Sequence, residues 1–273
     1  MHYFAGLFDA DGYISLSSSG SFTIAMEKAN EECINIFQST FGGSIYKRTR
    51  KTTPTYAWRL NGGTEKAIEF IDSIAHLCYV KREVLLQLRS YLKQSREQRR
   101  ESRKSYVHTI KALREYRIMT KEEMKIATYL TPSEEFFKWF AGFMDGDGNF
   151  SVFEYQNGQR RSFDSWIGAF NTCPWAIIHI NSHIHGSISS YKGIKLPVWK
   201  WVCSQKESEF VCKSLLPYLI GKKEQCRLVL DYLEINQKRL IGLKRGQHAI
   251  PVSDKDSVVI RDIIKQIKHL NSR

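Results

Sequence analysis

Two short segments with paired carboxylates are the part of this chain best suited to chemistry. Residues 4–12 read Phe-Ala-Gly-Leu-Phe-Asp-Ala-Asp-Gly, and residues 140–148 read Phe-Ala-Gly-Phe-Met-Asp-Gly-Asp-Gly. If the two copies pack together, four acids gather at one point, and hard oxygen ligands of this kind suit Mg²⁺. Metal-bound carboxylates activate water and stabilise the charge that develops on a phosphodiester. The pattern therefore indicates metal-dependent chemistry, and on a strongly basic chain it indicates such chemistry on nucleic acid.

The charge balance of the chain supports a polyanionic partner. Lys and Arg outnumber Asp and Glu by 41 to 28 in 273 residues, a formal net charge of +13. Nucleic acid is the commonest partner of so basic a protein, and a basic protein that is simply kept soluble by its charge is the alternative. The six cysteines show no Cys-x-x-Cys pair and no zinc-site spacing, which predicts thiols in the cores of an intracellular protein. From the sequence we expect no membrane-spanning run and no targeting segment.

Helices ending at the aspartates would place them where they repel one another. Ala5-Gly6 and Ala141-Gly142 are small pairs that let two helix backbones approach closely, and a glycine inside a helix costs roughly 1 kcal/mol relative to alanine. Gly12 and Gly148 follow as expected left-handed helix caps. The aspartates at these ends oppose the helix dipole and repel each other, so a divalent cation is the simplest group to offset them.

The repeat extends well beyond the two motifs. A hairpin pattern follows each motif, with a turn near Ser19-Gly20 in the first copy and a longer polar turn in the second. Helical patterns then recur in the same order, at 31–41 and 174–184, at 65–77 and 205–216, and at 82–100 and 222–240. We therefore expect an α+β protein of two pseudo-symmetric αββαββα halves with an extra helix. The expected divisions are 1–92, a basic linker over 93–132, and 133–273 with a C-terminal extension.

Two basic stretches invite a functional interpretation. Lys47-Arg48-Thr49-Arg50-Lys51 lies on an expected strand and its following turn, where alternation would aim the cations at both faces of the sheet. The linker begins with a run rich in arginine, residues 93–104. This run either continues the preceding helix with a solvated face or crosses a phosphate backbone, and the sequence leaves both readings open.

With these residues in view, the chain resembles the LAGLIDADG homing endonucleases, specifically the single-chain members with two motifs. The resemblance covers most of residues 2–240, and the two nonapeptides carry it. It implies a saddle of two four-stranded antiparallel sheets over a DNA duplex, with the motif helices as the interface between the halves. It further implies a monomer that makes a staggered, site-specific double-strand cut in a long DNA target with Mg²⁺ or another divalent cation such as Mn²⁺.

The resemblance also assigns roles to individual residues. It implies that Asp11 and Asp147 bind the metal, and that the carbonyls of Ala10 and Gly146 can join the metal shell. Asp9 and Asp145 match the structural acids of the motif. Lys81 and Lys222 match the basic residue near the active site, with Lys223 as the neighbouring rival of Lys222.

Other expectations are broader. His179, His183 and His185 have a spacing typical of metal ligands, but packing or solvent roles are favoured because they lie on an apolar helix and its end. An intron RNA maturase with host intron RNA as its partner, or an inactive DNA-binding derivative, is the rival function, and an organellar location would follow if the chain is intron-encoded. The side chains expected to contact DNA are Ser17, Ser19, Thr23, Lys28, Lys47, Arg48, Arg50, Arg59, Gln156, Arg160, Arg161, Lys192 and Lys200.

Overall fold

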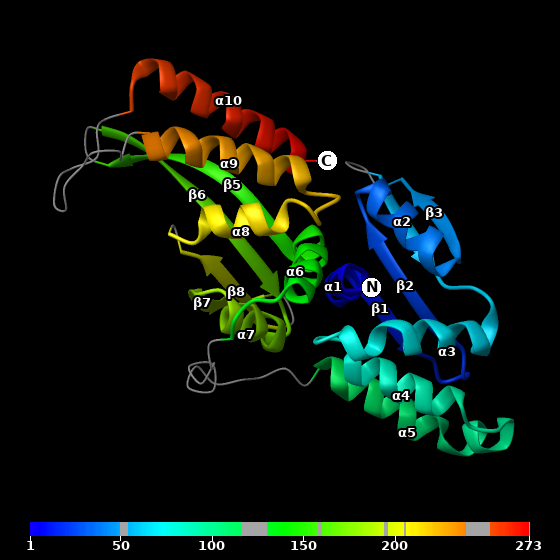
Figure 1. The fold of residues 1–273 in the computed structure, drawn as a ribbon. Helices are drawn as coiled ribbons and strands as arrows, with labels where there is room; N and C mark the ends of the chain where they lie inside the picture. Colours follow the sequence, from blue (N-terminus) through cyan, green and yellow to red (C-terminus); the bar gives the residue numbers. More distant parts are fainter. Residues whose placement is uncertain are drawn as a thin grey trace.

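The computed structural model describes residues 1–49, 54–115, 130–157, 160–193, 196–204, 206–238 and 252–272. Two halves with the same order of elements lie on either side of a central helix pair (Figure 1). The first half consists of α1 (His2–Asp11), β1 (Gly12–Leu16), β2 (Phe22–Lys28), α2 (Glu31–Phe41), β3 (Ser44–Arg48), β4 (Thr55–Arg59), α3 (Gly63–Ile74), the 3₁₀ turn η1 (Ala75–Leu77), α4 (Arg82–Leu92) and α5 (Arg96–Glu115).

The second half repeats this plan. It consists of α6 (Glu134–Asp147), β5 (Gly148–Asn157), β6 (Arg160–Asn171), α7 (Pro174–His183), β7 (Gly186–Tyr191), β8 (Val198–Cys203), α8 (Ser208–Leu215), α9 (Lys223–Lys238) and α10 (Asp254–Asn271). Each half holds a four-stranded antiparallel sheet, with the orders β1-β2-β4-β3 and β5-β6-β8-β7. The expected α+β fold of two pseudo-symmetric halves is confirmed.

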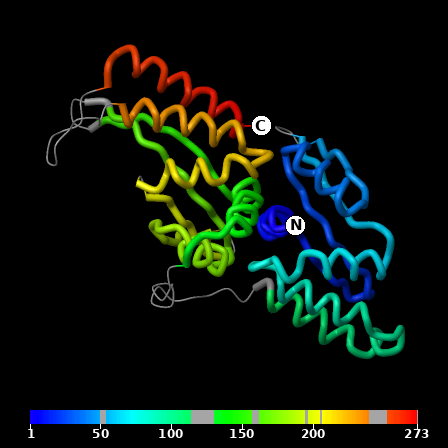
Figure 2. The backbone as a smooth tube through the Cα atoms, in the orientation of Figure 1, coloured from blue at the N-terminus to red at the C-terminus, as the bar shows by residue number. Residues whose placement is uncertain are grey.

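The central helices α1 and α6 lie side by side (Figures 1 and 2), and their glycines allow this contact. A Cβ added to Gly6 would lie 1.9 Å from the backbone oxygen of Trp139, and one on Gly142 would lie 1.9 Å from that of Tyr3. Both positions are therefore closed to any side chain. The expectation that the small pairs permit close helix packing is confirmed.

The glycines that end the motif helices differ from expectation. Gly12 has φ −66° and ψ 146°, and Gly148 has φ −90° and ψ 163°, so both are extended rather than left-handed. Their requirement is steric instead. A Cβ on Gly12 would lie 2.4 Å from the oxygen of Phe8, and one on Gly148 would lie 2.5 Å from that of Met144. The chain thus passes from helix directly into strand without a left-handed residue.

The expected helix at 82–100 is two helices. Ser95 and Gln98 form a reciprocal pair of bonds: the Ser95 amide donates to Gln98 Oε1 (2.9 Å), and the Gln98 amide donates to Ser95 Oγ (3.2 Å). This capping box begins a new helix, α5, inside the stretch expected to be a linker. α5 packs on α4 and beside β1, and α10 packs in the same way on α9 and β5. Both belong to the repeated plan, and α10 was not expected from the sequence.

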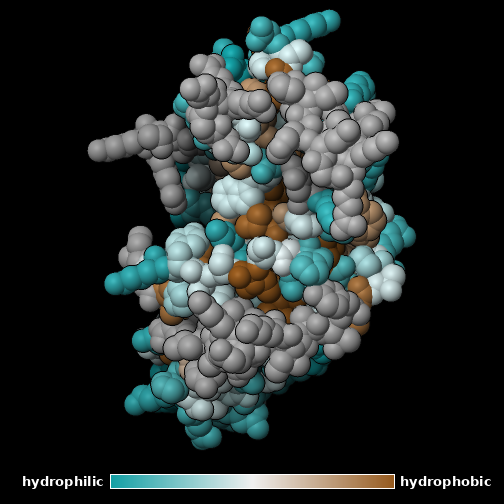
Figure 3. Space-filling model, turned by 90° about the vertical axis from the view of Figure 1, so that its left-hand side faces the viewer, coloured by the Kyte–Doolittle hydropathy of each residue, from teal (hydrophilic) through white to brown (hydrophobic). Residues whose placement is uncertain are grey.

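Each sheet has one face packed on helices and one open face. Met26, Trp58 and Ile45 are cross-strand neighbours on the packed face of the first sheet, where Met26 and Trp58 are fully buried. The alternate row leaves Tyr13 and Tyr46 about half exposed. Figure 3 views the molecule from the left-hand side of Figure 1 and shows hydrophobic side chains in the middle of that face, between hydrophilic regions above and below.

Two further findings complete the fold. All six cysteines are buried and none forms a disulfide, as the sequence predicts. Within the described residues, no helix is both long enough and apolar enough to span a bilayer.

Candidate active site at the ends of the motif helices

The C-terminal ends of α1 and α6 bring Asp11 and Asp147 to one place. A Cβ on Gly146 would lie 2.2 Å from Cβ of Ala10 and 3.1 Å from Oδ2 of Asp11, so the small residue between each pair of acids sits at the crossing of the helices. Burial, with the negative charge of Asp11, raises the pKa of Asp147 to about 6. The two carboxylates therefore interact unfavourably in the absence of a cation.

Asp9 and Asp145 are fully buried and hold the polypeptide that leads into α4 and α9. Asp9 accepts from the amides of Tyr79 (2.6 Å) and Lys81 (2.9 Å), and Asp145 accepts from the amide of Lys222 (2.7 Å). Each also accepts a bond from an aromatic side chain of the other motif helix. These arrangements match the structural role that the resemblance implies for both residues, and they fix the two lysines beside the motifs.

Those cross-interface bonds are related by the pseudo-symmetry. Trp139 Nε1 donates to Asp9 Oδ2 at 3.1 Å, and the Tyr3 hydroxyl donates to Asp145 Oδ2 at 2.8 Å. Tyr3 and Trp139 each precede the phenylalanine that opens a motif. The same buried acid thus joins the two halves and anchors the loop of its own half.

Lys81 and Lys222 point back onto the carbonyls at the ends of the motif helices. The Lys81 ammonium donates to the carbonyls of Asp9 and Ala10, and the Lys222 ammonium donates to those of Gly146 (2.8 Å) and Gly148 (2.6 Å), among others. Burial, with the nearby charge of Lys28, lowers the pKa of Lys222 to about 8. The structure places Lys222 here, whereas Lys223 is an exposed residue at the start of α9.

The site contains two residues whose place here was not expected. Lys28 was expected to contact DNA, but its ammonium donates to Asp11 Oδ2 at 2.8 Å and to the carbonyl of Asp145. Asn171 donates through Nδ2 to Asp147 Oδ2 at 2.5 Å. Register explains the match: Gly12 pairs with Met26 and Gly148 pairs with Ala169, and each partner lies two residues before Lys28 or Asn171. Aligning the two hairpins in the sequence could have revealed this equivalence.

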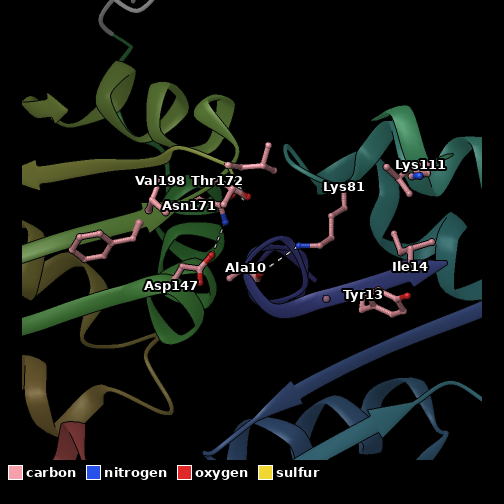
Figure 4. A pocket seen from close by; sticks show the side chains of 13 residues that line it. Ala10, Tyr13, Ile14, Lys81, Lys111, Asp147, Asn171, Thr172 and Val198 are labelled. Carbon is pink, nitrogen blue, oxygen red and sulfur yellow. Dashed lines mark hydrogen bonds between the residues drawn. The ribbon is translucent and has the colours of Figure 1, made fainter. Parts of the chain in front are cut away.

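Asp147, Lys81 and Ala10 line a pocket of about 750 Å³ between the halves (Figure 4). In the close-up, Asp147 with Asn171 and Thr172 comes from the second half, and Lys81, Ala10 and Tyr13 come from the first. Lys111 of α5 reaches the same pocket. The pocket therefore combines a carboxylate of one motif with the ammonium group that serves the other.

The residues expected to contact DNA are spread over several surfaces. Thr23, Arg48, Arg59 and Lys200 share the open faces of the sheets by register, with Arg48 ion-paired to Glu27 and Lys200 lying over the Trp166 ring. Ser17 and Ser19 lie at the β1–β2 turn, and Lys192 is exposed just after β7. Lys28, Lys47 and Gln156 belong to the opposite rows, which face the helices. Arg50 and the side chains of Arg160 and Arg161 lie outside the described residues.

The histidines have packing partners. The His179 ring stacks on Tyr79 at a centroid distance of 3.6 Å, and the His183 ring stacks on Phe136 at 4.1 Å. Burial lowers the pKa of His179 to about 3, which keeps it neutral. Among the described residues, no group of three or more His, Cys, Asp or Glu side chains could hold a metal ion.

A divalent ion fits the motif site on different grounds. Mg²⁺ is commonly held by one or two protein carboxylates together with substrate phosphates rather than by a complete protein cage. Asp11 and Asp147 supply two such carboxylates; burial, together with the charge of Asp11, raises the pKa of Asp147, and a bound cation would offset both effects. The carbonyls of Ala10 and Gly146 also lie here, although each already accepts a bond from a lysine.

The raised pKa of Asp147 leads to a stability test. Between about pH 4 and pH 6 the unfolded chain has this carboxyl ionised while the folded chain keeps it protonated, so stability should fall as the pH rises, by at most about 1.4 kcal/mol per pH unit. Asp147→Asn should remove this slope and raise the melting temperature at pH 7 without metal. Added Mg²⁺ should stabilise the unmodified protein more than the variant. Melting curves of the two proteins across this pH range measure the effect. Identical pH profiles for the unmodified protein and Asp147→Asn would contradict the prediction.

Comparisons with known proteins support the fold. No family model and no curated protein matches the chain. Among solved structures, I-SmaMI bound to an uncleaved DNA target in the presence of calcium ions has a TM-score of 0.69 at 14% identity over 98% of both chains. The LAGLIDADG meganuclease I-AabMI, bound to uncleaved DNA, has a TM-score of 0.68 at 12% identity over 96% of this chain and 97% of that one. The I-LtrWI LAGLIDADG homing endonuclease bound to target DNA has a TM-score of 0.68 at 15% identity over 97% and 96%. The chain therefore has the fold of the single-chain LAGLIDADG homing endonucleases.

Proposed function

We propose that the protein is a site-specific DNA endonuclease that makes a staggered double-strand cut with the help of a divalent cation. The observation that carries this proposal is the pair of carboxylates, Asp11 and Asp147, held at the crossing of two helices beside two lysine ammonium groups. A divalent cation bound there would activate water and stabilise charge on a phosphodiester. The strongly basic composition supports DNA as the partner, as do the DNA-bound neighbours of the same fold.

The residues of the chain divide the work as follows. Asp11 and Asp147 provide the oxygen ligands, and Asp9 and Asp145 fix the loops that carry the lysines. Lys81 and Lys222 hold positive charge beside the carbonyls of the motif ends, where the negative charge of a reacting phosphate would develop. Both lysines are partly buried, which reduces the screening of that charge by water.

A randomised duplex library tests the proposal directly. The full chain is incubated with the library and Mg²⁺, and the cut ends are sequenced. We expect paired ends with a constant overhang, enriched for one long sequence, and no cuts in EDTA. A protein that makes no metal-dependent double-strand cuts would not be an endonuclease. Tight binding to an intron RNA without any DNA cutting would favour the maturase alternative.

The two halves of the site should cut their strands at different rates, because the equivalent positions hold residues of different charge, Lys28 in the first half and Asn171 in the second. Lys28 forms an ion pair with Asp11, whereas Asn171 is a neutral hydrogen-bond donor to Asp147. If each half serves one strand, Lys28→Met should slow cutting of one strand by about 10²-fold relative to the other, the scale of a positioned polar group at a reacting centre. Single-turnover cutting of a duplex from the library, labelled on each strand in turn, measures the effect.

Lys47→Met is the matched control for this experiment. Lys47 lies in the same row of the sheet as Lys28, on the far side of their shared neighbour Tyr56, and it is exposed and does not line the motif pocket. It should leave the ratio of the two strand rates unchanged. Equal slowing of both strands by Lys28→Met would show that the two halves do not act separately.

A further inference from the structure

Helix α5 runs along the outer edge of the first sheet, from the hairpin turn to the motif pocket. β1 is the edge strand, and α5 packs beside it. Two turns into the helix, Arg103 Nη1 donates to the carbonyl of Ser19 in the β1–β2 turn at 3.2 Å. At its other end Lys111 lines the pocket that holds Asp147. From Arg96 to Lys111 the helix spans about 22 Å, at about 1.5 Å per residue.

The first two turns of α5 border an arginine cleft. Arg96, Arg99, Arg100 and Arg103 line a space of about 640 Å³ beside the β1–β2 turn, together with Ser19, Gly20, Tyr91 and one acid, Glu97. Within the described residues, none of these four arginines forms an ion pair with a carboxylate. Like charges three and four residues apart on a helix repel each other. The arrangement is therefore unfavourable until an anion enters the cleft.

The equivalent helix of the second half has a different electrostatic character. Arg261 of α10 forms a two-bond ion pair with Glu154 of β5, with N–O distances of 3.1 and 2.9 Å. That arginine already has its carboxylate partner within the fold. Among the described residues, the cations of α10 that form no ion pair are the exposed lysines Lys255, Lys265 and Lys268, so a cluster of unpaired arginines is particular to the first half.

We propose that this arginine cleft binds the phosphate backbone of duplex DNA beyond the β1–β2 turn, so that the protein grips one flank of its target more tightly than the other. The inference rests on the proposed function, since it extends the path of the same DNA. β1 has five residues and covers about 17 Å, or roughly five base steps, outward from the motif. A duplex is stiff over this distance, so one lying along the sheet continues to the cleft.

The chemistry of the cleft favours phosphate over bases. A guanidinium group binds phosphate through two parallel N–H donors, and backbone contacts of this kind fix position without reading sequence. Four arginines supply such donors around the cleft: Arg99 and Arg103 are partly buried, and Arg96 and Arg100 are exposed. Lys111, further along the helix, lines the pocket in which the phosphodiester would be cut.

A salt titration with charge-matched variants tests the cleft. The probe is a mixed-sequence duplex of about 40 base pairs in EDTA, which needs no knowledge of the target and allows no cutting. The test variant is Arg96→Gln/Arg99→Gln/Arg100→Gln. The control is Lys255→Gln/Lys265→Gln/Lys268→Gln, which removes three exposed charges from the equivalent helix α10. Circular dichroism melting establishes that both variants are folded.

The expected result is a shallower salt dependence for the α5 variant alone. Each lost phosphate contact reduces the slope of log K against log salt by about 0.9, so the α5 variant should lose about 2 to 3 and the α10 control less than about 1. Equal slopes for both variants would overturn the inference while leaving the proposed function intact. Failure of the unmodified protein to bind any duplex would overturn both. A structured RNA that binds more tightly than the duplex, with the same dependence on these arginines, would overturn the assignment to DNA.

A second measurement tests the asymmetry. On the sequence recovered from the library, one flank and then the other is trimmed back towards the cut. Trimming one flank should weaken binding by the unmodified protein by about 10-fold or more, and trimming the other should not. The affinity of the α5 variant should change little on trimming either flank. Equal losses from both flanks would overturn the inference.

Discussion

Asp11→Asn and Asp147→Asn should each abolish double-strand cleavage, and the protein carrying both should leave DNA intact. Each change keeps the shape of the side chain and removes the charge that a divalent ion requires. Loss of one preorganised electrostatic group at a reacting centre typically costs about 10²–10³ in rate, and a metal ligand is expected to lie at or above the upper end of this range. Each single variant should cut at most one strand. Denaturing and native gels together distinguish such a nick from a double-strand cut.

An exposed carboxylate on α10 provides the control for this prediction. Asp262 lies on neither sheet and outside the motif pocket, and its change to asparagine makes the same chemical alteration. Asp262→Asn should cut both strands at nearly the unmodified rate. If Asp11→Asn or Asp147→Asn still cut both strands efficiently, the assignment of the two motif carboxylates to catalysis would be wrong.

Gly142→Ala should destabilise the fold by about 3 kcal/mol or more, the upper range for forcing an atom into a packed interface. The added Cβ would lie 1.9 Å from the backbone oxygen of Tyr3 and 2.8 Å from the amide nitrogen of Leu7. Both are backbone atoms, so no side-chain rotation relieves the contact and the two helices must separate. Urea denaturation measures the loss in unfolding free energy.

Gly63→Ala separates this clash from the general cost of replacing a glycine. Gly63 has φ 75° and no atom within 4 Å of an added Cβ, so its replacement costs only the strain of left-handed backbone, about 1–2 kcal/mol. The mirror variant Gly6→Ala, whose Cβ would meet the oxygen of Trp139, should behave like Gly142→Ala. Equal losses for Gly63→Ala and Gly142→Ala would show that α1 and α6 can move apart at little cost.

The limits of sequence-based prediction are clear at α5 and α10. The periodicity predicts one helix over 82–100, whereas the capping box of Ser95 and Gln98, a short-range signal within a run dominated by charge, begins a second helix. The helix α10 also has such a signal, since Ser253 Oγ accepts from the amide of Asp256 and isoleucines follow at helical spacing. Neither helix is placed against its sheet by local sequence, because that placement depends on contacts between distant residues.

The glycines of the motifs show a related limit. Gly12 and Gly148 were expected to be left-handed because glycine often ends a helix that way, yet both are extended. Glycine is required at both positions by crowding against the preceding turn of its own helix. The residue type correctly indicates that only glycine is tolerated at these positions. Only the tertiary structure shows that the reason is a steric clash of an added Cβ rather than a left-handed φ.

By itself the sequence determined the duplication and the repeated αββαββα order, because these follow from residue types and spacings that recur along the chain. The two-sheet saddle and the roles of Asp11 and Asp147 followed from the family resemblance that the two motifs carry. Only the tertiary structure decided that Lys28 and Asn171 reach those carboxylates, that Lys222 rather than Lys223 lies at the motif, and that the arginines of α5 line a cleft. Those facts depend on which row of a strand faces a helix and on how distant helices pack. A shift of one residue in strand register moves a side chain to the other face of the sheet, and no local sequence pattern specifies the register that accurately.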